Sequence, residues 1–108
     1  MLKAAFVKVR EDKVGRLRAW SEELQGRAEE VRDAFAAQST NKERAYLVYG
    51  LETPLLVLVY DFDDPARAHE AFRSSTLAID QDYKRVMDEV MDDALDAEVL
   101  YEVGRLPG

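Results

Sequence analysis

The chain has 108 residues, of which 47% are hydrophobic and 34% are charged, a composition typical of one folded domain. Cysteine is absent, which excludes disulfides, thiolate metal sites and cysteine nucleophiles. The formal charge of −7 argues against a nucleic-acid partner, because binding to a phosphate backbone needs a basic face. We therefore expect a single domain over residues 1–108.

No segment suggests export or a membrane. The first eight residues lack the long apolar core of a signal peptide. The longest apolar run, residues 55–60, is too short to cross a bilayer. Together with the lack of cysteine, these features predict a cytoplasmic protein with no membrane partner.

The first third of the chain predicts a strand and then a helix. Residues 3–10 alternate, with Ala5, Val7 and Val9 on one side. Asp12 is a suitable helix cap, and apolar side chains then recur every three or four residues from Val14 to Phe35. This stripe predicts one helix of about seven turns, ended by the polar residues 38–42.

The remainder predicts a hairpin, two helical segments and a last strand. Residues 45–51 and 55–62 are rich in Leu, Val and Tyr and flank a short Glu-Thr-Pro turn. Asp63 and Asp64 before Pro65 are typical of a helix start, and this helix should break near residues 74–76. The second segment should point these side chains inward: Ile79, Tyr83, Val86, Met87, Val90 and Leu95. Residues 98–103 are predicted as the last strand, followed by a tail.

The element order is strand, helix, strand, strand, helix, strand. With right-handed crossovers it predicts an α+β fold of ferredoxin-like βαββαβ topology, with a four-stranded antiparallel sheet and both helices on one face. The first and last strands are neighbours in that topology. We therefore expect Val99, Tyr101 and Val103 to lie under the helices beside the first strand.

The strands are apolar on both faces, which predicts a homodimer. Leu55, Val57 and Val59 point one way in the third strand, while the alternate residues from 56 to 62 are also apolar or aromatic. Two helices cover only one face, so an apolar patch of several hundred Å² would remain exposed. A second copy related by a two-fold axis is the simplest cover.

Four segments carry a resemblance to a known group of proteins. They are residues 6–10 (FVKVR), 14–20 (VGRLRAW), 43–46 (ERAY) and 75–83 (STLAIDQDY). With them the chain resembles the dimeric α/β-barrel superfamily, in which two ferredoxin-like subunits stack their sheets around a shared cavity, and most closely an uncharacterised bacterial family within it. The superfamily includes antibiotic-biosynthesis and haem-degrading monooxygenases.

The resemblance does not extend to histidine or metal chemistry. Related families often carry histidines around the Ile-Asp segment, where this chain has Leu77 and Tyr83. The only histidine, His69, lies loosely where the haem-degrading relatives place an axial ligand, but the charged residues around it indicate a solvent-facing position. Trp20 is expected in the core. The two acidic clusters (residues 61–64 and 88–96) are read as a helix cap and a solvated helix face, so no metal and no cofactor are expected.

The candidate site lies on the sheet face opposite the helices. There Lys8 and Arg10 would oppose Glu98 and Glu102, either as cross-strand ion pairs or as the polar part of a mixed pocket. Tyrosines from several strands would supply phenols. The predicted ligand-binding residues are Phe6, Lys8, Arg10, Tyr46, Tyr60, Glu98 and Leu100.

Three functions remain open at this point. The first is a homodimer that binds a small apolar or aromatic ligand in a cavity between sheet and helices. The second, implied by the resemblance, is a cofactor-independent monooxygenase or isomerase in which Lys8, Arg10 or a tyrosine steers an enolate-like substrate. The third is a structural or protein-interaction module. No nucleophile–base pair, phosphate loop or dinucleotide fingerprint is present.

Overall fold

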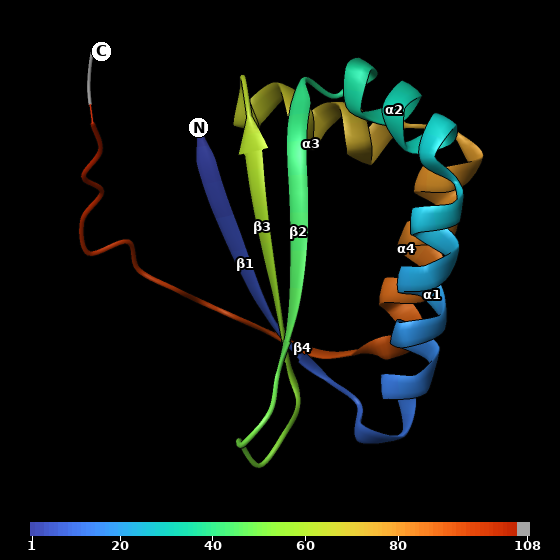
Figure 1. Ribbon diagram of the computed structural model, residues 1–108, viewed down its shortest axis with the longest axis vertical. Coiled ribbons are helices and arrows are strands. Elements are labelled where there is room, and N and C mark those ends of the chain that lie inside the picture. The colour runs from blue at the N-terminus through green and yellow to red at the C-terminus, as the bar shows by residue number, and fades with distance from the viewer. Residues whose placement is uncertain (106–108) are drawn as a thin grey trace.

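The computed structural model describes residues 1–105, which form one antiparallel sheet with all helices on one of its faces (Figure 1). The strands stand in the order β2-β3-β1-β4. The elements in chain order are β1 (Leu2–Val9), η1 (Glu11–Lys13), α1 (Val14–Gly26), α2 (Ala28–Ala37), β2 (Thr40–Val48), β3 (Leu55–Phe62), α3 (Pro65–Ser74), α4 (Ala78–Val90) and β4 (Met91–Leu95). No helix within these residues is long and apolar enough to cross a membrane.

The predicted α+β fold is confirmed. The two central strands, β3 and β1, pair antiparallel, and β2 and β4 flank them as edge strands. Phe6 of β1 and Tyr46 of β2 both stand opposite Val57 of β3. This order and the single helical layer are compatible with ferredoxin-like topology.

The predicted seven-turn helix is wrong, because the chain breaks at Arg27 into α1 and α2. Arg27 has φ −108° and ψ 44°, and its N–H bonds the carbonyl of Leu24 at 3.1 Å. The glycine at position 26 weakens the helix at this point. The Arg27 guanidinium then binds Glu23, Glu30 and Asp82, which anchors the break against α4.

The start and end of α3 agree with the prediction. The Asp64 carboxylate accepts a hydrogen bond of 3.2 Å from the Arg67 N–H, and Pro65 occupies the first turn. The helix ends at Ser74, and α4 begins four residues later. The hairpin is also confirmed, although β2 begins at Thr40 rather than at residue 45.

The position of the last strand was predicted wrongly. The fourth strand is β4, residues 91–95, and it pairs with β1 directly after α4 ends. The Arg10 N–H bonds the Val90 carbonyl at 2.9 Å, which holds the end of α4 beside the end of β1. The residues directly after α4 therefore lie along the edge of β1 and pair with it. Leu95 is consequently a strand residue opposite Phe6 and not part of the helix.

Residues 96–105 leave the sheet and run on its helix-free side (Figure 1). Val99, Tyr101 and Val103, expected under the helices, are 79–83% exposed in this extension. These residues do not pair with β1 because β4 already occupies that edge of it.

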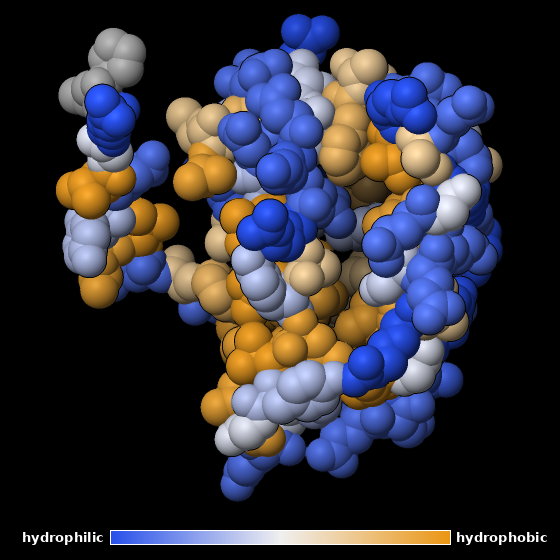
Figure 2. Space-filling view, viewed as in Figure 1, coloured by the Kyte–Doolittle hydropathy of each residue, from blue (hydrophilic) through white to orange (hydrophobic). Residues whose placement is uncertain are grey.

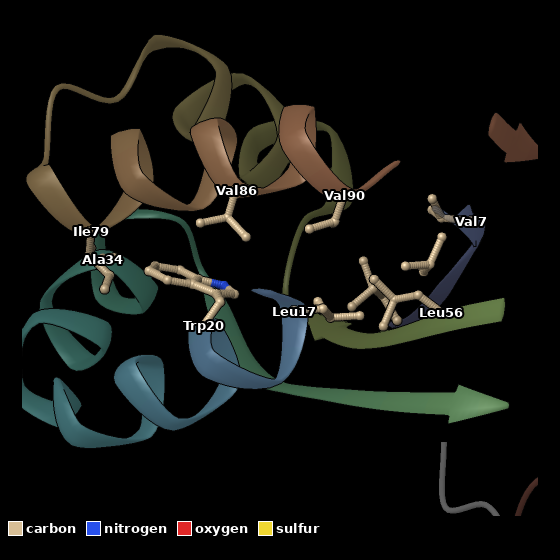
Figure 3. Close-up of a cluster of buried hydrophobic side chains, with 10 residues drawn as sticks. Val7, Leu17, Trp20, Ala34, Leu56, Ile79, Val86 and Val90 are labelled. Carbon is tan, nitrogen blue, oxygen red and sulfur yellow. The ribbon is translucent and has the colours of Figure 1, made fainter. Parts of the chain in front are cut away.

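The core lies between the sheet and the helices, nearer the end of β1 that leads into α1 (Figure 3). It contains Trp20, 2% exposed, which confirms the predicted core position. Side chains of β1, β3, α1, α2 and α4 complete it: Val7, Val9, Leu17, Ala34, Leu56, Leu58, Ile79, Val86 and Val90.

The helix-free face of the sheet is also apolar, as predicted. Phe6, Leu55, Val57 and Val59 are only partly covered there, and Tyr46 is 48% exposed. The strands therefore carry apolar side chains on both faces. We call this helix-free surface the open face.

Candidate functional site

A cavity of about 660 Å³ lies between the sheet and the helices, at the end of the layer away from the core. Figure 2 shows the molecule hollowed between the sheet and the helical layer. The walls of the cavity come from the starts of β1 and β2, the end of β3, and α1–α4. The apolar lining residues are Ala4, Ala5, Leu24, Ala28, Val31, Ala34, Phe35, Phe62, Pro65, Ala68, Phe72 and Ile79.

The sheet floor of this cavity is polar where three strands meet. Tyr60 of β3 stands opposite Lys3 of β1 on one side and opposite Glu43 of β2 on the other. Residues directly opposite in antiparallel strands share a face, so these three side chains form a row beneath the helices. This row replaces the apolar residues that cover the rest of the helix-facing side.

Tyr83 of α4 joins this row from above. Its hydroxyl lies 3.4 Å from Glu43 Oε2, to which it donates, and 3.2 Å from the Tyr60 hydroxyl. Trp20 and Phe72 contact the Tyr83 ring edge-on at centroid distances of 6.0 and 5.5 Å. These rings fix the orientation of the phenol, so one carboxyl and two phenol oxygens lie together on the cavity wall.

The surroundings of Glu43 favour its neutral form. Within residues 1–105 no cation pairs with its carboxylate. The pKa of Glu43 is raised to about 7, mainly by burial and to a smaller extent by the negative charge of Asp80, although the Tyr83 hydrogen bond opposes the shift. Burial also raises the pKa of Tyr60 to about 12 and that of Tyr83 well above its usual value. Near neutral pH both phenols are therefore protonated, and the carboxyl group of Glu43 is partly ionised.

The second carboxylate of the cavity has a structural role. Asp80, 5% exposed, accepts hydrogen bonds from Gln38 Nε2 at 2.7 Å and from Ser75 Oγ at 2.6 Å. These contacts join the end of α2 to the start of α4. Asp80 thus holds the helical wall in place with its own hydrogen bonds satisfied.

Basic side chains border the cavity. Lys3, Arg32 and His69 belong to its lining and are exposed. The exposure of His69 agrees with the solvent-facing position expected for it. Lys3 and Arg32 therefore place positive charge at the border of a cavity whose interior carries two carboxyl groups.

The predicted site residues do not meet in one place. Phe6, Lys8 and Tyr46 lie on the open face, where Lys8 stands opposite Asp93 of β4 and not opposite Glu98 or Glu102. Tyr60 points to the other face, into the cavity.

The other three predicted residues lie away from both. Arg10 follows β1 and donates from Nε to the Met91 carbonyl at 3.2 Å. Glu98 and Leu100 belong to the exposed extension.

Sequence reasoning missed Glu43 as a site residue. Its signal was present: Glu43 precedes Ala45 and Leu47 in alternation, so it is a carboxylate on a strand's helix-facing side. The prediction began that strand at residue 45 and left Glu43 outside it. Tyr83 was correctly placed inward on its helix, but its partner could not be identified without the register.

The comparison with protein families gives one match, a profile that covers residues 2–107 and describes a family of unknown function, DUF6176. The chain belongs to DUF6176. No curated protein matches this DUF6176 member, and no solved structure matches it either.

Proposed function

We propose that this protein binds a small apolar or aromatic molecule in the cavity between its sheet and helices. The observation that carries the proposal is the cavity of about 660 Å³ with apolar walls and three clustered oxygens on its sheet side. Small-molecule sites typically occupy roughly 300–1,000 Å³ and combine apolar walls with a few polar groups.

The side chains at the cavity indicate the kind of ligand. Phe35, Phe62 and Phe72 offer aromatic surface to a flat apolar body. The cluster of Glu43, Tyr60 and Tyr83 offers both a hydrogen-bond donor and an acceptor to a single carbonyl or hydroxyl group. A bicyclic aromatic ketone meets both requirements.

The test is calorimetric titration with 2-tetralone. We expect saturable binding with one site per chain. Val31→Phe, which adds a ring to the α2 wall, should weaken binding at least tenfold. Val99→Phe makes the same change in the exposed extension and should leave binding unaltered. Equal affinity in wild type and Val31→Phe, or no binding to the wild type, would refute the proposal.

We also infer that two copies pair through the open face, as the resemblance to dimeric α/β barrels implies. Phe6, Val57 and Val59 supply an apolar centre. A two-fold axis makes this apolar patch complementary to itself, which supports a second copy as the occupant.

Sedimentation equilibrium tests this assembly. The wild type should sediment at twice its 12.3 kDa mass. Val57→Lys at the centre of the open face should give the monomer mass, whereas Leu77→Lys at the start of α4 should still give the dimer. A monomeric wild type would refute the dimer.

A further inference from the structure

We propose that Glu43 is a general base that moves a proton on an enolisable carbonyl compound bound in the cavity, with Tyr60 binding the carbonyl oxygen. This inference rests on the proposed ligand site and assigns it a reaction. The substrate class is an apolar, preferably aromatic, ketone with an acidic C–H next to the carbonyl.

The position of Glu43 is that of a base and not of a structural carboxylate. Asp80, in the same cavity, is held by Gln38 and Ser75 at 2.7 and 2.6 Å. Glu43 receives one long hydrogen bond of 3.4 Å, and within residues 1–105 no cation pairs with it. Its lone pairs therefore remain available to a C–H bond of a ligand.

The proton affinity of Glu43 is suited to this step. A general base works best when its pKa lies near the operating pH. Burial raises the pKa of Glu43 to about 7. At neutral pH about half of the molecules then hold the carboxylate, and the conjugate acid is strong enough to return the proton.

The two phenols can support the oxygen of the enolate. The Tyr60 and Tyr83 hydroxyls lie 3.2 Å apart, and either can donate. When Tyr83 donates to Tyr60, the Tyr60 proton is free for a ligand oxygen, and Glu43 is released from its weak bond to Tyr83. Both phenols stay protonated at neutral pH, because burial raises the pKa of each. Lys3, opposite Tyr60, adds positive charge on the same side.

The proposed step balances without a co-reactant. The Glu43 carboxylate takes the proton from the α-carbon, the C–H electron pair becomes the carbon–carbon double bond of the enolate, and the carbonyl π pair moves onto the oxygen bound by Tyr60. Glu43 then returns the proton to the same carbon, which is exchange, or to a conjugated carbon, which is isomerisation. Ketosteroid isomerase uses a comparable division, with a carboxylate as the base and an oxyanion hole that contains a phenol.

The test follows exchange of the C1 protons of 2-tetralone in deuterated buffer by ¹H NMR, corrected for exchange in buffer alone. The wild type should accelerate exchange, with a rate that rises with pH through about 7 as Glu43 ionises. Glu43→Gln should lower the enzymatic rate at least ~100-fold while calorimetry still detects the bound ketone. Glu22→Gln, a matched change at an exposed position of α1, should exchange at the wild-type rate.

Tyr60→Phe separates the base from the oxygen contact. It should slow exchange about tenfold or more while the rate still rises with the ionisation of Glu43, because the carboxylate is retained. Binding of 2-tetralone without faster proton exchange, or equal exchange rates in wild type and Glu43→Gln, would refute the role of Glu43 as a base. Either result would be compatible with the ligand site. Absence of binding to the wild type would overturn both.

Discussion

Replacing Glu43 by glutamine removes a carboxyl group whose ionisation opposes folding. In the folded protein its pKa is about 7, against an ordinary value of 4.5, because burial disfavours the charged form. Between these two values the folded state binds more protons than the unfolded state. The free energy of unfolding therefore falls as the pH rises from about 4.5 to about 7, and stays lowered above that range.

The size of this effect follows from the two pKa values. Their difference corresponds to about 3 kcal/mol, since one pH unit is worth about 1.4 kcal/mol. Glutamine keeps the shape of the side chain and cannot ionise. We compare the free energy of unfolding of Glu43→Gln with that of the wild type at each pH. This difference should be up to ~3 kcal/mol more favourable to the variant at pH 8.5 than at pH 4.

Urea unfolding at pH 4, 6 and 8.5 measures this difference. Subtracting the wild type from Glu43→Gln cancels the titration of the other groups, and Glu22→Gln, the same change at an exposed position of α1, serves as the control. A difference between Glu43→Gln and wild type that does not change with pH would show that Glu43 titrates normally. It would also remove the basis for proton transfer near neutral pH.

Three further predictions follow from individual contacts. Asp64→Ala removes the cap that accepts the Arg67 N–H and should lower the free energy of unfolding by about 1 kcal/mol in urea, whereas an unchanged value would mean that the cap is not formed in solution. Val86→Ala, at a position 1% exposed in the core, should lower the free energy of unfolding by about 2 kcal/mol. A loss below about 0.5 kcal/mol would contradict the packing of α4 against the core. Tyr83→Phe removes the hydrogen bond that lowers the pKa of Glu43, so the Glu43 carboxyl ¹³C resonance should titrate at higher pH than in the wild type; a lower midpoint would contradict the contact.

The sequence predicted elements whose signals are local. The Asp-Asp-Pro start of α3, its end at Ser74 and the hairpin between β2 and β3 each depend on residues close together in the chain. The apolar alternation in β3 predicted an open face as well as a core face. Such features follow from capping, turn chemistry and period-two patterning.

The failures concern competition between segments. Residues 98–103 alternate better than residues 91–95, but β4 follows α4 directly and occupies the edge of β1 first. The apolar stripe from Val14 to Phe35 continues across Arg27, whose ion pair with Asp82 of α4 exists only in the folded chain. Neither outcome is encoded in local periodicity.

The candidate site was predicted only in part for the same reason. Tyr60 was chosen as a phenol that lines a pocket, but the neighbours assigned to it came from the wrong face. Its true partners, Glu43 across the strand and Tyr83 on α4, follow from the β2–β3 register and from helix packing. Both depend on the tertiary structure.

The central claim is that the cavity between helices and sheet is the ligand site. Intermolecular nuclear Overhauser effects from bound 2-tetralone test it most directly. The account predicts effects to the ring protons of Tyr60, Phe72 and Tyr83, which line the cavity. Effects to Phe6 and Tyr46 of the open face instead would place the ligand on the other side of the sheet and contradict the account.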